Sequence, residues 1–132
     1  MNLETIVPIV TTTALRETRA FYTDLLGFQI SFDHERYLGV RAGDKGAPEL
    51  GFMQPDPECP DTFGGKGITL GLSVADADAE CARLRGLGVA ILQEPTDQPW
   101  GARSFVIADP NGVALYISHP IPAAVEFAAC VR

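Results

Sequence analysis

The pattern of apolar and polar positions in the first half of the chain predicts a strand, a helix and three further strands. An apolar, β-branched run at 6–13 is typical of a strand. Residues 14–27 then place apolar side chains at helical spacing and end in Gly27, a residue type that commonly follows a helix. Three short strands are predicted after it, at 28–32, 37–42 and 49–54. This order of elements is a βαβββ unit.

The same order of elements recurs in the second half, after a proline-rich segment at 55–67 that we expect to be an exposed linker. Asp76 has the side chain of a helix N-cap and precedes acidic and then basic residues, so a helix is predicted over 76–88. The strands of this half are predicted at 68–74, 89–94, 102–108 and 113–118. The last two flank DPNG at 109–112, in which Asn-Gly is typical of a hairpin turn.

The two halves also share a short sequence pattern where the helix gives way to the next strand. LLGFQI at 25–30 corresponds to GLGVAI at 86–91, as a repeat of roughly 60 residues requires. PIPAAVEFAACVR at 120–132 predicts a short helical tail, which packs either on the body of the protein or on a partner chain. We therefore expect one domain over residues 1–132, with modules at about 4–55 and 67–119 and the tail at 120–132.

Composition narrows the class of protein. A chain of 132 residues that is 46% hydrophobic can bury a core as one domain. Its net charge of -7, with only ten Lys and Arg residues, disfavours nucleic acid and anionic membranes as partners. The absence of a long apolar run and of a signal-peptide pattern predicts a cytoplasmic protein. Three scattered cysteines predict free thiols.

These features resemble the vicinal oxygen chelate superfamily, which contains glyoxalase I, extradiol dioxygenases and bleomycin-binding proteins. The motifs that carry the resemblance are FYTDLLGF at 21–28 and DPNG at 109–112, and it covers about residues 4–119. The resemblance implies an α+β fold, in which tandem βαβββ modules form a curved mixed sheet cup with helices on the outer face. It also implies that the modules pair either within one chain or across a dimer, and that a small-molecule ligand lies in the cup. The assembly that we expect is a homodimer.

Metal-using members of this superfamily carry four ligands, which are His, Glu or Gln. Carried over to this sequence, the ligand positions are Val7, Glu49, Thr69 and Tyr116. Only Glu49 supplies a good donor, whereas a divalent ion needs about three or four N or O donors. The resemblance therefore favours metal-free drug-binding members, with no metal and no cofactor.

Several metal-free drug-binding members have a Trp-Gly-x-Arg segment before the penultimate strand, and WGAR at 100–103 matches it. The ring of Trp100 either stacks on a planar or cationic ligand or folds back to close one end of the sheet. Arg103 either pairs with a carboxylate of the ligand or ties Asp97 or Asp109 into the structure.

Other residues are candidates for the wall of the ligand site. Glu49 would attract a basic group if its face lines the cup, and is otherwise a strand-end acid in water. Tyr116 can both stack and hydrogen-bond, while Thr69 and Val7 would be ordinary pocket wall. The candidate aromatic lining is Phe32, Tyr37, Phe52 and Phe105, although strand alternation lets each of them face the helix and join the core instead.

The histidines and cysteines are expected to have no chemical role. His34 and His119 fall at none of the carried-over ligand positions, and we expect solvated surface positions for them. Cys81, inside a helix, is expected in the core. Cys59 lies between prolines and is accessible, but no nearby base would activate it.

The sequence leaves three functions open. The leading hypothesis is a metal-independent protein that sequesters a planar aromatic or partly cationic compound, such as an antibiotic. The second is an enzyme, a lyase, isomerase or dioxygenase with a non-standard metal shell around Glu49, to which dimerisation would bring His34 or His119. The third is a module recruited to other proteins through the apolar tail at 120–132.

Overall fold

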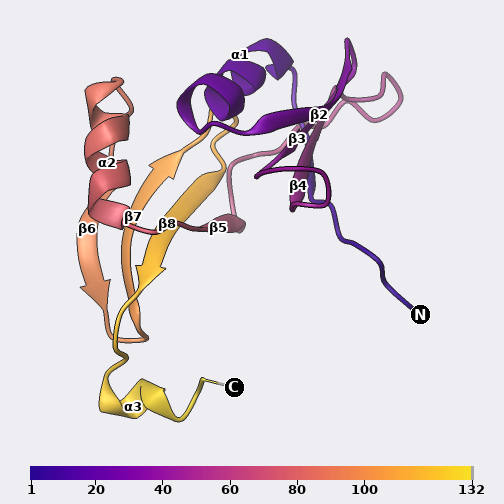
Figure 1. Ribbon diagram of the computed structural model, residues 1–132. Helices are drawn as coiled ribbons and strands as arrows, with labels where there is room; N and C mark the ends of the chain where they lie inside the picture. The colour runs from indigo at the N-terminus through magenta and orange to yellow at the C-terminus, as the bar shows by residue number, and fades with distance from the viewer. Residues whose placement is uncertain (132) are drawn as a thin grey trace. The chain divides into compact units, whose positions relative to one another are not determined.

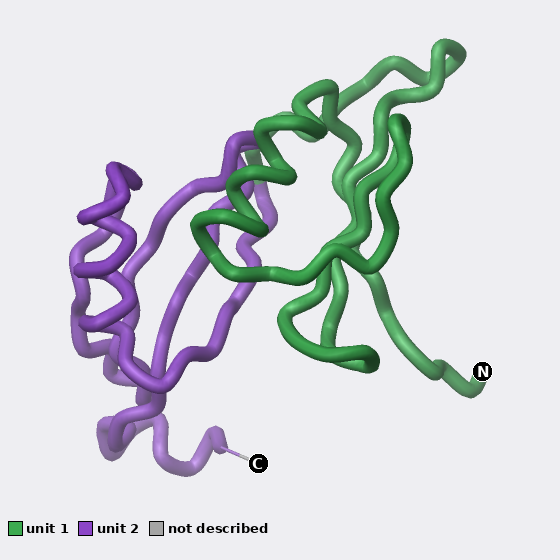
Figure 2. Tube along the Cα trace, turned by 45° about the horizontal axis from the view of Figure 1, so that its top comes forward, with its two compact units in different colours: residues 1–66 green, residues 67–132 purple. Residues whose placement is uncertain are grey.

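The computed structural model describes residues 1–131 and divides into two compact units, Met1–Lys66 (unit 1) and Gly67–Arg132 (unit 2) (Figure 2). The boundary between the units falls within the segment predicted as a linker. Each unit has a strand, a helix and three strands, which form an open, four-stranded mixed sheet. The predicted α+β class is therefore confirmed, as is the repetition of the βαβββ order.

Unit 1 contains β1 (Ile9–Thr11), α1 (Leu15–Ala20), a π-helical turn η1 (Phe21–Leu25), β2 (Gln29–His34), β3 (Tyr37–Arg41) and β4 (Glu49–Met53) (Figure 1). The strand order is β1-β4-β3-β2. β1 runs parallel to β4, whereas the β2/β3 and β3/β4 pairs are antiparallel. The parallel pair is the first strand with the last, because the helix crosses over the sheet between them.

Two predicted elements of unit 1 differ from the observed ones. The first strand begins at Ile9 rather than at residue 6, since Pro8 has no N–H to donate to a ladder, although its carbonyl accepts from the N–H of Gly51 at 2.9 Å. The predicted helix over 14–27 is α-helical only to Ala20 and then widens into η1, in which the N–H of Leu26 bonds the carbonyl of Phe21. Gly27, at φ +75°, ends the helix as predicted.

The core of unit 1 is largely aromatic and lies between the helix and one face of the sheet. Tyr22 is fully buried, and its ring centroid lies 5.0 Å from that of Phe52, 5.2 Å from that of Phe21 and 5.4 Å from that of Phe28. Three of these rings belong to the helix and the residues after it, and Phe52 belongs to β4. Edge-on and tilted ring contacts of this kind add to the stabilisation from burial.

Unit 2 contains β5 (Thr69–Ser73), α2 (Ala77–Gly86), β6 (Gln93–Gln98), β7 (Ala102–Ala108), β8 (Ala114–Pro120) and α3 (Val125–Ala128). Its strand order, β5-β8-β7-β6, repeats that of unit 1, again with a parallel pair of first and last strands. Asp76 caps α2 as predicted, because its carboxylate accepts from the N–H of Ala79 at 3.1 Å. Among the described residues, no helix is long and apolar enough to cross a membrane.

The strand predicted at 89–94 is wrong in position. β6 is instead the polar stretch Gln93–Gln98, which contains Pro95. Proline cannot donate to a ladder, and it is tolerated here because β6 is an edge strand and its pairing with β7 is irregular between Gln93 and Thr96. The observed β6 leaves Trp100 in a short turn between two strands rather than in a long loop.

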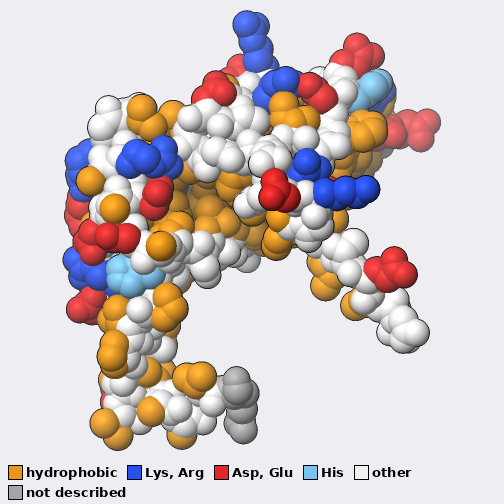
Figure 3. All heavy atoms as spheres, in the orientation of Figure 1, with side chains coloured by type: hydrophobic (Ala, Val, Ile, Leu, Met, Phe, Trp, Pro, Cys, Tyr) orange, Lys and Arg blue, Asp and Glu red, His pale blue; other side chains and the backbone are white. Residues whose placement is uncertain are grey.

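The tail forms the predicted short helix α3 and contacts the β6–β7 turn of its own unit. The N–H of Ile121 donates to the carbonyl of Gly101 at 2.9 Å, and the N–H of Ala124 donates to that of Pro99 at 2.8 Å. Beyond these bonds the tail exposes apolar side chains, since Val125 is 91% and Val131 is 72% exposed (Figure 3). The first part of the tail is therefore fixed to the body, which is one of the two alternatives that the sequence left open.

Candidate functional site

Each sheet has one face that packs against the helix of its own unit and one face that does not, which we call the helix-free face. On the helix side of unit 1 lie Leu38, Val40 and Phe52, and on that of unit 2 lie Phe105, Ile107 and Leu115, all of them buried. Side chains alternate between the faces of a strand, so the residues between these point to the helix-free faces. Most candidate ligand-binding residues lie there.

Two predicted site residues of unit 2 are joined directly. The indole Nε1–H of Trp100 donates to the hydroxyl oxygen of Tyr116 at 3.0 Å. Tyr116 lies on β8 between the buried Leu115 and Ile117, and its own side chain therefore projects from the helix-free face. Trp100 is 49% exposed, so part of its ring remains accessible while its polar edge is satisfied. The pair forms an amphipathic aromatic surface at one end of the sheet.

The position of Trp100 depends on the glycine that follows it. Gly101 has φ +104°, a backbone conformation that other residues rarely adopt. A Cβ at this position would lie 3.1 Å from the carbonyl oxygen of Ile121 and 3.2 Å from the Cβ of Ala123. The Trp-Gly turn and the tail therefore fit together only with glycine at this position.

The rest of the helix-free face of unit 2 carries small and polar side chains. Thr69 is opposite Ala114 in the β5/β8 register, two residues along each strand from the Gly71/Tyr116 pair. This places Thr69 on the face that carries Tyr116, as expected from the resemblance. The other side chains of this face include Ser73, Thr96, Gln98, Ser104 and Ser118.

In unit 1 the structure places Val7 and Glu49 on one face. Ile9 is opposite Gly51 in the parallel β1/β4 register, and the same register extended by two residues sets Val7 beside Glu49. Both side chains are half-buried. The hydroxyl of Ser31 on β2 donates to the Oε2 atom of Glu49 at 3.1 Å.

Tyr37 and Phe32 lie on this same helix-free face of unit 1. Their rings meet edge-on, with centroids 5.7 Å apart, and Phe32 is 56% exposed. The phenol of Tyr37 crosses Gly51, where an added Cβ would lie 2.2 Å from its Oη atom. A cavity of about 250 Å³ opens beside Tyr37 and is also lined by Arg36, Met53, Gln54 and Asp56.

Two of the candidate aromatic residues belong to the core instead. Phe52 packs on Tyr22 beneath α1, and Phe105 lies on β7 between strands on the helix side of unit 2. Both are fully buried, so a ligand cannot reach them without disrupting the core. These two rings therefore belong to the core and do not line a ligand site, and we leave Phe52 and Phe105 out of the proposed site.

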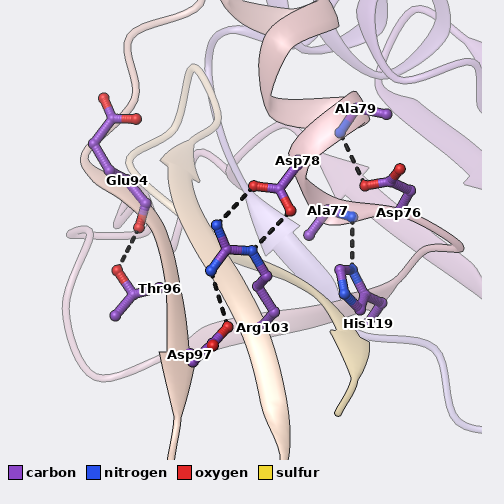
Figure 4. A network of polar contacts seen from close by, with 9 residues as sticks. All are labelled: Asp76, Ala77, Asp78, Ala79, Glu94, Thr96, Asp97, Arg103 and His119. Carbon is purple, nitrogen blue, oxygen red and sulfur yellow. Dashed lines mark hydrogen bonds and ion pairs between the residues drawn. The ribbon is translucent and has the colours of Figure 1, made fainter.

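Arg103 lies on the opposite side of the sheet from Tyr116. Its guanidinium donates to the carboxylate of Asp78 on α2, at 2.7 and 2.9 Å, and to that of Asp97 on β6, at 2.9 Å (Figure 4). Arg103 thus ties α2 to β6 and β7. This is the second of the two roles considered for Arg103, a structural tie, although its partners are Asp97 and Asp78 and not Asp109. We therefore also leave Arg103 out of the proposed site.

The charges of this network stabilise one another. The hydrogen bonds from Arg103 hold the pKa of the Asp78 carboxyl below its ordinary value. The hydrogen bonds to Asp78 and Asp97 raise the pKa of the Arg103 guanidinium. Asp78 and Arg103 therefore both remain charged over the physiological range of pH.

The histidines and the DPNG turn have structural contacts. The Nδ1 atom of His119 accepts from the N–H of Ala77 in the first turn of α2 at 2.8 Å (Figure 4). His119 is half-buried, so the solvated surface position expected for it is wrong. His34 is exposed, as expected. Asp109 is buried, and its Oδ1 atom accepts from the N–H groups of Asn111 and Val113, which makes DPNG a turn as predicted.

The three cysteines are free, with Cys81 buried in the core and Cys59 exposed, as expected.

The donor set does not fit a divalent metal. Of the four carried-over positions, Val7 offers no donor, and Thr69 and Tyr116 offer neutral hydroxyls, that of Tyr116 already engaged by Trp100. Glu49 alone carries an anionic donor. Within residues 1–131, no three side chains of the types His, Cys, Asp and Glu gather where they could hold a metal ion.

Two successive βαβββ units, each with an open mixed sheet, are the fold that the resemblance implied, and comparison with known proteins assigns the chain to the same superfamily. The chain belongs to the Glyoxalase/Bleomycin resistance protein/Dioxygenase superfamily, whose family model matches residues 5–117. The curated relatives include an uncharacterised protein of Mycobacterium bovis, 36% identical over 62 residues, which are 47% of this chain and 41% of that protein. The aligned part of the chain thus spans about two fifths of that relative's length.

Solved structures match over most of the chain. One is TnmS3, an antibiotic binding protein from Streptomyces sp. CB03234, with 30% identity, a TM-score of 0.74 and coverage of 91% of this chain and 98% of TnmS3. Another is a glyoxalase/bleomycin resistance protein from the same organism, with 32% identity, a TM-score of 0.65 and coverage of 85% of this chain and 96% of that protein.

Proposed function

We propose that this protein binds a planar aromatic or partly cationic small molecule on its helix-free faces, without a metal and without catalysing a reaction. The observation that carries the proposal is the bond of the half-exposed Trp100 to Tyr116, which holds a large ring in place at 3.0 Å from its partner. A ring already held in position loses little further conformational entropy when a flat ligand stacks on it.

Two further observations support this proposal. At three of the four positions where metal-using members have metal ligands, this chain has Val7, Thr69 and Tyr116. These side chains offer an apolar and hydrogen-bonding surface in place of a metal site. TnmS3 binds an antibiotic and is 30% identical to this chain over nearly its whole length. We therefore include antibiotics among the ligands to be tested.

The proposed assembly is a homodimer. Both sheets are open, with β1 and β2 at the edges of one and β5 and β6 at the edges of the other, and unpaired edges are available to a second copy of the chain. The cytoplasmic location, and the exclusion of nucleic acids and membranes as partners, stay predictions from composition.

Trp100 makes the ligand hypothesis directly testable because it is the sole tryptophan. We expect planar aromatic compounds, such as acridines, to quench or shift its emission and to raise the melting temperature of the protein. Tyr116→Phe removes the acceptor of the indole N–H and should weaken binding by about 2- to 10-fold, the value of one hydrogen bond. Leu87→Ala, which trims another exposed apolar side chain of unit 2, should leave binding unchanged.

Compounds that raise the melting temperature without any change in Trp100 emission would remove Trp100 from the site. Elemental analysis of protein purified without chelators tests the metal-free part of the proposal separately. We expect no metal in stoichiometric amount. One equivalent of Fe, Ni, Mn or Zn would instead favour the enzyme alternative, with Glu49 as a ligand.

A further inference from the structure

The helix-free face of unit 1 contains a half-buried carboxylate without a cationic partner. Arg41 is directly opposite Glu49 in the β3/β4 register, which is the usual position for a cross-strand ion pair. Its Nε–H instead donates to the carbonyl of Gly43 at 3.0 Å. Among residues 1–131, no Lys, Arg or His side chain forms an ion pair with Glu49, and its observed partner is the neutral hydroxyl of Ser31.

A β-bulge brings Ser31 to this carboxylate. The β2/β3 register shifts between Ile30 and Phe32, so that Ser31 and Phe32 together face Gly39. In a regular strand these neighbours would point to opposite faces, whereas the bulge turns both toward the helix-free face. An added Cβ on Gly39 would lie 2.6 Å from the hydroxyl oxygen of Ser31 and 3.2 Å from the Cβ of Phe32, so the pair fits because that residue is glycine.

A second glycine makes room for Tyr37. Gly51 is opposite Gly39, and the phenol of Tyr37 lies across Gly51. A Cβ added to Gly51 would lie 2.2 Å from the Oη atom and 2.9 Å from the Cζ atom of Tyr37. Gly51 is also two residues along β4 from Glu49, on the same face. Both glycines are thus buried beneath these side chains, and the face carries the carboxylate of Glu49 and the hydroxyl groups of Ser31 and Tyr37.

We infer that Glu49, Ser31 and Tyr37 form a subsite that selects ligands carrying a protonated amine. This inference rests on the proposed function and specifies which chemical group of a ligand is recognised on the helix-free face of unit 1. An ammonium group has three N–H donors and no acceptor, which matches a carboxylate and two hydroxyl oxygens. The aromatic faces of Tyr37 and Phe32 add a favourable surface for a cation. The missing ion pair of Glu49 is then supplied by the ligand.

A matched pair of probes separates charge from ring stacking. Dansylcadaverine carries a flat ring system and a primary ammonium group, whereas its N-acetyl derivative has the same ring and no charge. We expect the wild-type protein to bind the ammonium form about tenfold more tightly, in line with a hydrogen bond to a charged group. Glu49→Gln should remove this preference and leave the affinity for the acetylated probe within about twofold.

Three outcomes overturn the inference. Equal binding of both probes to the wild-type protein, or a preference that survives in Glu49→Gln, excludes a role for the carboxylate while the proposed function stands. Failure of the ammonium probe to bind also overturns it. If in addition no planar compound changes the emission of Trp100 or raises the melting temperature, the proposed function fails as well. Glu17→Gln is the matched control, because it removes the same charge from α1, on the other side of the sheet, and should keep the preference.

Two further measurements serve if Glu49→Gln does not fold. Added NaCl should weaken binding of the ammonium probe to the wild-type protein and leave the acetylated probe unaffected, since ions screen a charge pair. Equal salt effects on both probes would contradict the inference. Tyr37→Phe keeps the ring and removes one oxygen, so the preference should fall by about threefold. An unchanged preference in Tyr37→Phe would remove the phenol from the subsite.

Discussion

The two units have the same strand order, and in each the helix both packs on the sheet and is tied to it by an ion pair, Arg19–Asp33 in unit 1 and Arg103–Asp78 in unit 2. The other side chains that hold the two helices differ. In unit 1, Tyr22 joins the helix to Phe52 of the sheet through an aromatic core that is sealed from solvent. In unit 2, the exposed edge of α2 is tied by Arg103 to β6 and β7, and by His119 to β8. A repeated topology therefore fixes where a helix lies without fixing the interactions that keep it there.

The helix-free faces differ as well. That of unit 1 carries a carboxylate, the exposed ring of Phe32 and the half-buried ring of Tyr37, whereas that of unit 2 carries small hydroxyl side chains, Val106 and the Trp100–Tyr116 pair. The face of unit 1 thus offers a negative charge, and that of unit 2 offers an uncharged aromatic surface.

The largest effect is expected from the aromatic core of unit 1. Tyr22→Ala leaves a cavity between three rings and should lower the free energy of unfolding by about 3–5 kcal/mol, as for other buried aromatic residues. Urea unfolding of the variant and of the wild type measures this difference in the free energy of unfolding. Phe32→Ala, which trims a ring that is 56% exposed, should cost well under about 1 kcal/mol. Similar costs for the two variants would mean that unit 1 does not depend on its aromatic core.

A smaller effect is expected at the Trp100 turn of unit 2. Gly101→Ala places a side chain at φ +104° and against the backbone of the tail, so we expect a loss of about 1–3 kcal/mol and release of residues 121–131. Urea unfolding and limited proteolysis of the tail report the two effects. Gly86→Ala, at the end of α2 with nothing within 4 Å, should be neutral or stabilising. A stable Gly101→Ala variant with a protected tail would show that this turn tolerates other residues.

The sequence predicted most elements because their patterns are strong and local. β7 was predicted with its observed bounds, since its β-branched and aromatic residues lie between the turn residues Gly101 and Asp109. β6 was missed because its residues are polar and include Pro95, and only its place at the sheet edge makes this acceptable. An edge position depends on strand order, which the periodicity of a segment does not contain.

The candidate site shows the same limit. Alternation along β8 correctly separates Tyr116 from the buried Leu115 and Ile117. The placement of Ser31 could not be predicted, because a bulge shifts the alternation by one residue without a clear sequence signal. Asp78 as the partner of Arg103 was also missed, since the two residues are 25 positions apart and meet only when α2 packs on the sheet.

The smallest effect should come from the ion pairs of unit 2, and it should depend on pH. The pKa of Asp78 is depressed in the folded protein, so its contribution to stability is present above the ordinary carboxyl pKa of about 4 and is lost as the pH falls through the lower folded value. Asp78→Asn should therefore lower the melting temperature at pH 7, and the difference from wild type should disappear in acid. Asp61→Asn, which removes an exposed carboxylate in the linker, should follow the wild type at every pH. A difference for Asp78→Asn that persists to pH values well below about 3 would show that the ion pair with Arg103 is not the source of the stability that the variant loses.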